Sequence, residues 1–337
     1  MEGSLLIRAR AWMFGGIGVV AAACVVGVLA LMWWWDYEPA HFDVSAAAQA
    51  RATASSGKVV TGSITTSALM TSAETLLDKR GGYLSNDRFP PGVLMDNVPN
   101  WEFGVLTATR DLARALRNDF SRSQTQSVED KDLQEADPLF SSPNDRWLLP
   151  SSESQYRKAI AHVGVYLARL GDSDDSNAQF YARADNLADY LQVVSARLGS
   201  LSQRLSAAAG QVRIDTDLGG DPHAQQSTPA TSPRLVQTPW TKIDDNFYEA
   251  RGYTWALREQ LEAIRIDFAP ILASKNAAVS LEQVIRELEE SQKALGSPIV
   301  LNGTPFGFFA NHSLVMANYI SRANAAVIDL RELLKRG

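Results

Sequence analysis

The chain of 337 residues is poor in the side chains that form disulfides and bind metals, with one cysteine, Cys24, and four histidines. A single thiol cannot form an intramolecular disulfide, so apolar packing has to stabilise the fold. The histidines show no H-x-x-x-H or H-E-x-x-H spacing, the pattern that places two zinc ligands on one helix face. The sequence therefore predicts no metal site.

Signatures of nucleotide and acyl chemistry are also missing. The chain has no Gly-x-Ser-x-Gly elbow and no glycine-rich loop ending in Lys-Ser or Lys-Thr. An excess of basic residues is missing too, since 32 Lys and Arg face 38 Asp and Glu, for a net charge of -6. A nucleic-acid-binding protein needs a basic surface to neutralise phosphates. We expect no cofactor and no nucleic-acid partner.

One segment, Ala11 to Trp35, lacks charge altogether and is flanked by charges of opposite sign. Arg8 and Arg10 precede it, whereas Asp36 and Glu38 follow it. A helix of this length would measure about 37 Å, longer than the roughly 30 Å hydrocarbon core of a bilayer. Because basic residues favour the cytoplasmic side, we predict a cytoplasmic N-terminus over 1–10, a transmembrane helix over 11–35, and the remainder outside the cytoplasm.

A cleaved signal peptide and a lipoprotein signal share part of this pattern. The apolar run is longer than a usual signal core, and three tryptophans, Trp33 to Trp35, occupy the zone where a cleavage site would lie. The run also continues well past Cys24, where a lipoprotein would turn polar. We therefore predict an uncleaved anchor whose aromatic end lies in the headgroup layer.

Apolar residues outside the anchor recur at alternating spacings of four and three, the pattern of helices packed at shallow angles. The longest such run predicts one helix over roughly 177–209. Its apolar positions are Phe180, Ala184, Leu187, Leu191, Val194, Leu198, Leu201 and Leu205. The pattern recurs over 156–170, 257–268 and 316–334, and strand signals are limited to runs such as 58–64 and 298–301. The predicted fold class is mainly α: one N-terminal transmembrane helix followed by an extracytoplasmic helical bundle.

Composition divides the remainder of the chain into four parts. Residues 36–57 are predicted as a juxtamembrane stalk, although their alanines also suit a helical extension. Residues 58–218 form a helical region, 219–239 a Pro/Ser/Thr-rich linker or loop, and 240–337 a C-terminal helical region that packs on the first. Heptads pack within one chain as readily as between chains, so the oligomeric state stays open.

The segment 81–99 is rich in Gly, Pro, Asn and Asp, which is typical of a functional loop or a structured cap. Two carboxylates of this segment, Asp87 and Asp96, are weak catalytic candidates, together with Glu102 of the predicted helix that follows. A hydrolase of glycans needs two carboxyl groups with separated pKa values. The alternative, which we prefer, is that residues 96–100 make turns and cap the following helix.

Polar and aromatic residues near these carboxylates and elsewhere are candidates for binding a ligand or partner. They are Tyr83, Asn86, Asn97, Asn100, Trp101, Arg122 and His312. Arg122 stands among hydroxyl groups that could bind an anion, and His312 stands beside two asparagines near the start of the last helix. Capping or packing is the more ordinary role for His312.

Several motifs resemble one uncharacterised family of Gram-negative inner-membrane proteins, catalogued as domain of unknown function 2333. They are Gly81-Gly82-Tyr83-Leu84-Ser85-Asn86-Asp87, Pro90-Pro91-Gly92, Pro99-Asn100-Trp101-Glu102-Phe103-Gly104, Phe120-Ser121-Arg122-Ser123-Gln124, Leu198-Gly199-Ser200-Leu201-Ser202-Gln203-Arg204-Leu205 and Ala310-Asn311-His312-Ser313-Leu314.

The resemblance covers nearly all of the exported part and implies an inner-membrane anchor with a periplasmic domain. It carries no activity. We predict a binding or scaffolding component of the cell envelope, with an envelope protein or peptidoglycan as partner. The alternative is an envelope hydrolase of glycans or peptides.

Overall fold

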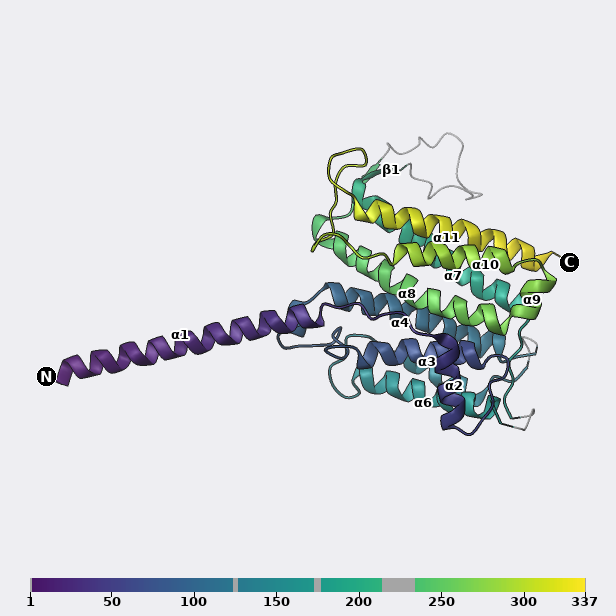
Figure 1. Cartoon of the computed structure of the whole chain (residues 1–337), viewed down its shortest axis with the longest axis horizontal. Helices are drawn as coiled ribbons and strands as arrows, with labels where there is room; N and C mark the ends of the chain where they lie inside the picture. Colours follow the sequence, from purple (N-terminus) through teal and green to yellow (C-terminus); the bar gives the residue numbers. More distant parts are fainter. Residues whose placement is uncertain (1, 124–126, 173–176, 214–233, 337) are drawn as a thin grey trace, which may run out of the picture.

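The computed structural model of the chain describes residues 2–123, 127–172, 177–213 and 234–336 (Figure 1). The described residues are mainly α-helical, as the apolar spacing predicts. The α-helices are α1 (Glu2–Trp35), α2 (Val44–Ala54), α3 (Ser63–Asp78), α4 (Asn97–Ala115), α5 (Lys131–Phe140), α6 (Ser152–Leu170), α7 (Ala184–Ser206), α8 (Ile243–Asp267), α9 (Ala269–Ser274), α10 (Ala278–Ser291) and α11 (His312–Lys335).

Shorter elements join these helices. Four are single turns: η1 (Gly92–Leu94), the π-helical turn η2 (Leu116–Phe120), η3 (Ala207–Ala209) and η4 (Trp240–Lys242). Two strands of three residues, β1 (Gln211–Arg213) and β2 (Arg234–Val236), pair antiparallel with Val212 opposite Leu235. The predicted linker over 219–239 lies mostly outside the described residues, and the segments 58–64 and 298–301 contain no strand.

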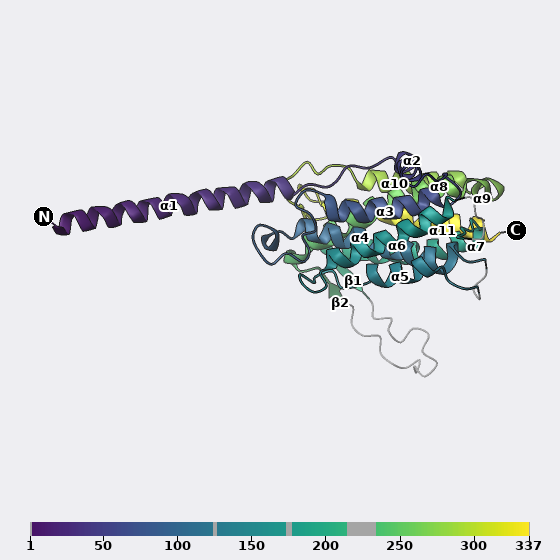
Figure 2. The same ribbon diagram turned by 90° about the horizontal axis from the view of Figure 1, so that it is seen from below.

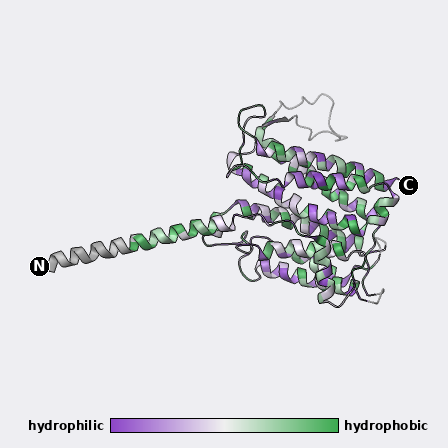
Figure 3. Cartoon of the chain, in the orientation of Figure 1, coloured by the Kyte–Doolittle hydropathy of each residue, from purple (hydrophilic) through white to green (hydrophobic). Residues whose placement is uncertain are grey.

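The helix α1 contains an apolar stretch, Ile17–Trp35, that is long enough to cross a membrane and is not buried in the fold. It projects from one end of the bundle, roughly along the bundle's length (Figures 1 and 2). Colouring by hydropathy shows this stretch as mostly apolar up to its last turn, whereas the bundle helices mix both kinds of residue (Figure 3). The helix is thus consistent with a membrane anchor or a signal sequence.

Helices of the bundle run alternately toward and away from the end at which α1 emerges (Figure 1). Four connections therefore meet at that end, which we call the α1 end. They are residues 79–96 between α3 and α4, 141–151 between α5 and α6, the described residues 207–213 and 234–242 between α7 and α8, and 292–311 between α10 and α11. Residues 36–43 run along the bundle to α2, and the described parts of the other connections lie at the opposite end, where α9 turns the chain.

The predicted heptad positions of α7 are buried from Leu187 to Leu205, and α7 packs against α11. The seam of α11 runs through Met316, Ile320, Ala323, Val327, Leu330 and Leu334, all buried. The start of α7 differs from the predicted helix over 177–209, because Phe180 precedes α7 and packs against Phe120 and Phe268 in an aromatic cluster. Tertiary packing there overrides the helical periodicity.

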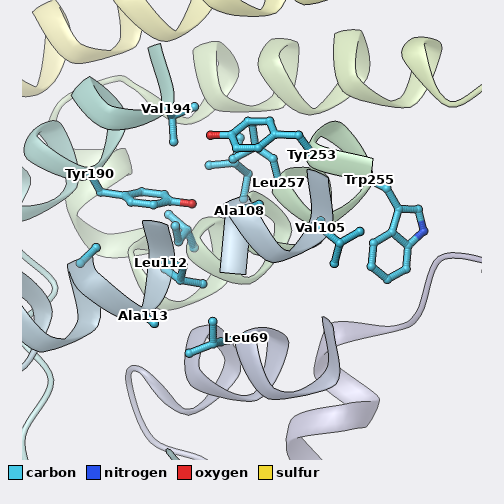
Figure 4. Packing of buried hydrophobic residues seen from close by; sticks show 14 of the residues in the cluster. Leu69, Val105, Ala108, Leu112, Ala113, Tyr190, Val194, Tyr253, Trp255 and Leu257 are labelled. Carbon is cyan, nitrogen blue, oxygen red and sulfur yellow. The ribbon is translucent and has the colours of Figure 1, made fainter. Parts of the chain in front are cut away.

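One hydrophobic core extends over the bundle and includes residues of both predicted helical regions. Figure 4 shows its centre, where Val105 and Leu112 of α4 lie near Tyr253 and Leu257 of α8. Helices α4 and α8 can approach closely because each contributes a glycine. A Cβ atom on Gly104 would lie 2.1 Å from the Glu249 carbonyl oxygen, and one on Gly252 would lie 1.9 Å from that of Trp101.

Residues 36–57, which we predicted as a stalk, lie on the bundle. Asp43 caps α2 by accepting hydrogen bonds from the backbone N–H groups of Ser45 and Ala46. Val44 and Ala48 of α2 are buried, and α2 packs against α3 and α8. The bundle therefore follows α1 directly, without a free spacer.

Candidate functional site

A crevice of about 480 Å³ opens at the α1 end beneath residues 36–41. Its other walls come from the start of α4, from α8 and from the segment 292–298. Trp101 and Trp255, whose ring centroids are 5.3 Å apart, contribute aromatic surface. Asp36, Glu38 and Arg251 contribute charge. Apolar walls with a few fixed polar groups are typical of ligand sites.

Arg251 holds the crevice together, with 4% of its surface exposed. Its Nε donates to Glu38 Oε1 at 2.7 Å, and its Nη2 also pairs with the Glu38 carboxylate. Nη1 donates to the carbonyl oxygen of Lys293 at 2.9 Å. One guanidinium thus ties the chain that leaves α1 to the chain that leaves α10.

A second pair with one buried partner lies further along the same linker. His41 Nδ1 lies 2.5 Å from Glu259 Oε1, and the Glu259 side chain is fully buried. Arg258 also contacts Glu259, at 3.2 Å, and the His41 ring stacks on Trp255 with centroids 6.1 Å apart. In the described part of the chain, His41 has no hydroxyl or thiol partner, so this pair lacks the nucleophile of a catalytic triad.

Glu102 is wholly buried and accepts bonds from the segment that follows α3. The N–H groups of Leu84 and Ser85 donate to it at 2.9 and 2.8 Å, the Ser85 hydroxyl donates at 2.5 Å, and Lys79 Nζ pairs with it at 2.5 Å. Burial raises the pKa of Glu102, and the contacts with Lys79, Ser85 and Leu84 offset this rise only in part. The carboxylate has no exposed atoms and holds the segment after α3 against α4. We call this ion pair the Lys79–Glu102 pair.

Tyr83 and Asn86 are also buried, and they join the segment 79–96 to the connection between α5 and α6. The Tyr83 hydroxyl donates to the Asn144 carbonyl oxygen at 3.1 Å. Asn86 Nδ2 donates to the Arg146 carbonyl oxygen at 2.7 Å and to Glu153 Oε2 at 2.8 Å. Neither side chain is free to meet a large ligand, and both hold two loops together.

The remaining candidates of this region lie in settings that differ from that of Glu102. Asp87 is partly buried; burial and Glu153 raise its pKa, while Lys79, the partner of Glu102, lowers it. Asp96 and Asn97 line a separate cavity of about 170 Å³ beside the end of α1. Asp96 precedes α4 without capping it through its side chain, whereas Asn100 donates to Asp245 Oδ1 of α8 at 2.9 Å. The three carboxylates thus lie in different environments: Glu102 is wholly buried, Asp87 is partly buried and Asp96 lies beside α1. This arrangement does not favour a hydrolase, which needs two carboxyl groups that flank the bond to be cleaved.

Arg122 and His312 lie apart from these residues. Arg122 follows η2 at the opposite end of the bundle and lies 3.8 Å from Glu129. His312 is the first residue of α11, and its Nδ1 accepts a hydrogen bond from Leu301 N–H at 3.1 Å. It lines a cavity of about 180 Å³ that shares Arg251 and Leu295 with the crevice. Burial lowers the pKa of His312.

The crevice includes Trp101 among the predicted residues, but sequence reasoning missed its polar groups. Glu38 and Arg251 are 213 positions apart, and His41 and Glu259 are 218 apart. No local pattern could pair them. The run Arg251-Gly252-Tyr253-Thr254-Trp255 was the available signal, since it places a cation beside aromatics at the core edge.

Comparison with known proteins adds the family and nothing on chemistry. Neither the curated proteins nor the solved structures contain a match to this chain. A model of uncharacterized proteins conserved in bacteria matches residues 7–337, which is nearly the whole chain. This match confirms the resemblance noted from the motifs, and the chain belongs to the family catalogued as domain of unknown function 2333 (DUF2333).

Proposed function

We propose that the protein is a single-pass component of the bacterial inner membrane whose periplasmic helical domain binds and positions another protein of the cell envelope. The basic residues before the apolar stretch and the acidic residues after it support a cytoplasmic N-terminus. The uncleaved anchor is part of this proposal.

The observation that carries the proposal is the attachment of the linker to the bundle. Glu38 and His41 are both held by buried partners, Arg251 and Glu259, so anchor, linker and bundle form one unit. A partner that enters the crevice therefore meets a surface at a fixed height and orientation above the membrane. Such fixed geometry suits a scaffold, because little conformational entropy is lost on binding.

The crevice favours a protein segment as its occupant. Its aromatic surface suits an apolar side chain, and Asp36 on its wall suits a neighbouring cation. Glu38 lines the same crevice, and Asp96 lines the adjoining cavity with Asp36; burial and then these two carboxylates raise the pKa of Asp36. A cationic group on a partner would relieve the repulsion between these carboxylates.

Photocrosslinking in cells tests the proposal. A photoreactive amino acid replaces Tyr248 or Ser297 at the crevice, and Val279 at the opposite end serves as the matched control. We expect both crevice positions to trap one defined envelope protein and the control to trap none. Trapping of glycan strands that a muramidase releases would instead identify peptidoglycan, and no specific product at either position would overturn the proposal.

A further inference from the structure

Exposed aromatic side chains of the bundle gather at the α1 end. Beyond Glu38, the described chain exposes phenylalanine and tryptophan at six positions: Phe89, Trp147, Trp240, Phe306, Phe308 and Phe309. All six belong to connections at the α1 end or to η4, which leads into α8 there. Two are essentially uncovered, with exposures of 104% for Phe306 and 97% for Phe308. Exposed apolar clusters of this kind mark contact surfaces.

The same connections lack charge at their tips. No charged residue occurs over 294–311, in a chain of which 21% is charged. Residues 89–95 and 147–151 are also uncharged, and they add the exposed side chains of Val93, Leu94, Leu148 and Leu149. Surface loops of water-soluble domains are ordinarily polar. Uncharged loops with exposed apolar side chains are therefore better suited to contact with an apolar surface than with water.

The first apolar tip, which we call the Phe89 tip, consists of residues 89–95 with 147–150. Phe89 and Trp147 pack edge to face with centroids 5.7 Å apart. Arg88 Nη2 donates to the Asp145 carbonyl oxygen at 3.1 Å, beside the bonds from Tyr83 and Asn86 that join the same loops. The Lys79–Glu102 pair fixes the base of the tip. Its apolar side chains are therefore presented by a braced structure.

The second tip, which we call the Phe308 tip, consists of residues 304–309. Asn311 braces its base by donating from Nδ2 to Asn302 Oδ1 at 2.8 Å and to the Gly303 carbonyl oxygen at 2.6 Å. Asn302 in turn donates to the Ala208 carbonyl oxygen at 3.1 Å, which links the loop to η3, the turn that follows α7. Phe308 and Phe309 pack edge to face above this base.

The end of α1 is fixed against the same region. The Arg80 guanidinium lies over Trp34 at 4.3 Å and over Tyr37 at 4.2 Å, and a Cβ atom on Gly81 would lie 2.7 Å from the Trp35 ring. In both Figures 1 and 2 the connection 79–96, which carries the Phe89 tip, comes level with the last turns of α1. Trp33 and Trp34 are exposed there, where an anchor meets the headgroup layer.

We propose that the Phe89 tip and the Phe308 tip lie in the headgroup layer of the leaflet from which α1 emerges, so that the chain meets the bilayer at three places, α1 and the two tips. The occupant of this apolar surface is lipid because α1 already brings the bilayer to it. Aromatic side chains on an uncharged loop are the residues that partition into the interface. The inference rests on α1 being the membrane anchor of the proposed function. It adds that the domain lies on the membrane surface.

Depth-dependent fluorescence quenching of the full chain in phosphatidylcholine/phosphatidylglycerol liposomes tests the inference. The environment-sensitive dye NBD is placed at Leu149→Cys or Phe308→Cys in a Cys24→Ser background. The matched controls Val128→Cys and Val279→Cys are exposed at the opposite end of the bundle. The unaltered chain, labelled at its single cysteine Cys24, reports on α1.

We expect nitroxide-labelled lipids to quench the dye at positions 149 and 308 at least threefold more than at the controls, and aqueous iodide to show the opposite order. Equal exposure to iodide at all four positions would overturn the inference. Protection from iodide without quenching by lipid would also overturn it, because a second copy would then cover the tips. If Cys24 itself escaped lipid quenching, the anchor and the proposed function would fail, whereas quenching at Cys24 alone would refute only the surface contact.

Discussion

Removing the charge of Glu102 should destabilise the protein strongly. The Glu102 side chain is fully buried and that of Lys79 is 2% exposed, so neither charge is solvated once its partner is lost. Breaking such a pair from one side costs roughly 3 to 5 kcal/mol. Glu102→Gln also replaces one acceptor oxygen by a donor that faces the N–H groups of Leu84 and Ser85. We expect a loss of unfolding free energy of about 3 to 5 kcal/mol.

The assay is urea unfolding of the full chain in detergent micelles, followed by tryptophan fluorescence, with amide hydrogen exchange at Leu84 and Ser85 as a local readout. The double variant Lys79→Met/Glu102→Gln leaves no charge unpaired and should lose less than Glu102→Gln alone, about 1 to 3 kcal/mol.

Arg157→Met is the matched control, because it breaks the exposed ion pair with Asp78 one position before Lys79. It should change stability by about 1 kcal/mol or less. The reasoning is refuted if Glu102→Gln lowers the unfolding free energy no more than Arg157→Met does. It is also refuted if the loss in the double variant equals the sum of the losses in the single variants Lys79→Met and Glu102→Gln.

Three further predictions concern the helix crossing, the linker and the response to pH. Gly252→Ala should lower the melting temperature in a calorimetric scan, because its Cβ would lie 1.9 Å from the Trp101 carbonyl oxygen, whereas Gly199→Ala, which meets only Asn324 at 3.6 Å, should leave it equal or higher. Arg251→Met should free the linker, so limited proteolysis should cut near residues 36–41 several-fold faster than in Arg322→Met, a control whose partner Glu287 lies on α10. Burial and Asp189 raise the pKa of Asp119 to about 6, so its protonated form stabilises the fold below about pH 4 and this contribution is lost as the pH rises through 6. Asp119→Asn should remove that pH dependence in urea titrations and be more stable than the parent at pH 7, and an unchanged pH profile would contradict the assignment.

The sequence predicted the parts of the fold that follow from local periodicity. The seams of α7 and α11 appear as buried positions because a heptad records burial directly in residue spacing. Phe180 obeyed the same spacing but precedes α7, since its ring is needed in the cluster with Phe120 and Phe268. Periodicity does not report such a competing contact.

The candidate site was less accessible to sequence reasoning because its key pairs join distant segments. The alternative reading of 81–99 as a structured cap anticipated a bound loop, but Asp96 makes no side-chain cap, and the loop is held by Glu102 instead. The residues that join linker to bundle, Glu38 and Arg251, carry no local signal. A membrane-facing end could not be foreseen either, because only the fold brings the tips at 89–95, 147–150 and 304–309 to the end at which α1 emerges.

The central claim is that α1 stays attached and holds the bundle at the membrane surface. Intact-mass spectrometry of the protein extracted from bacterial membranes tests it most directly. The account predicts the mass of a chain that retains residues 11–35, recovered in the membrane fraction. The mass of a chain that begins after Trp35 would contradict it. Such cleavage would remove Trp34, whose ring contacts Arg80, and the two apolar tips would no longer be held at a bilayer.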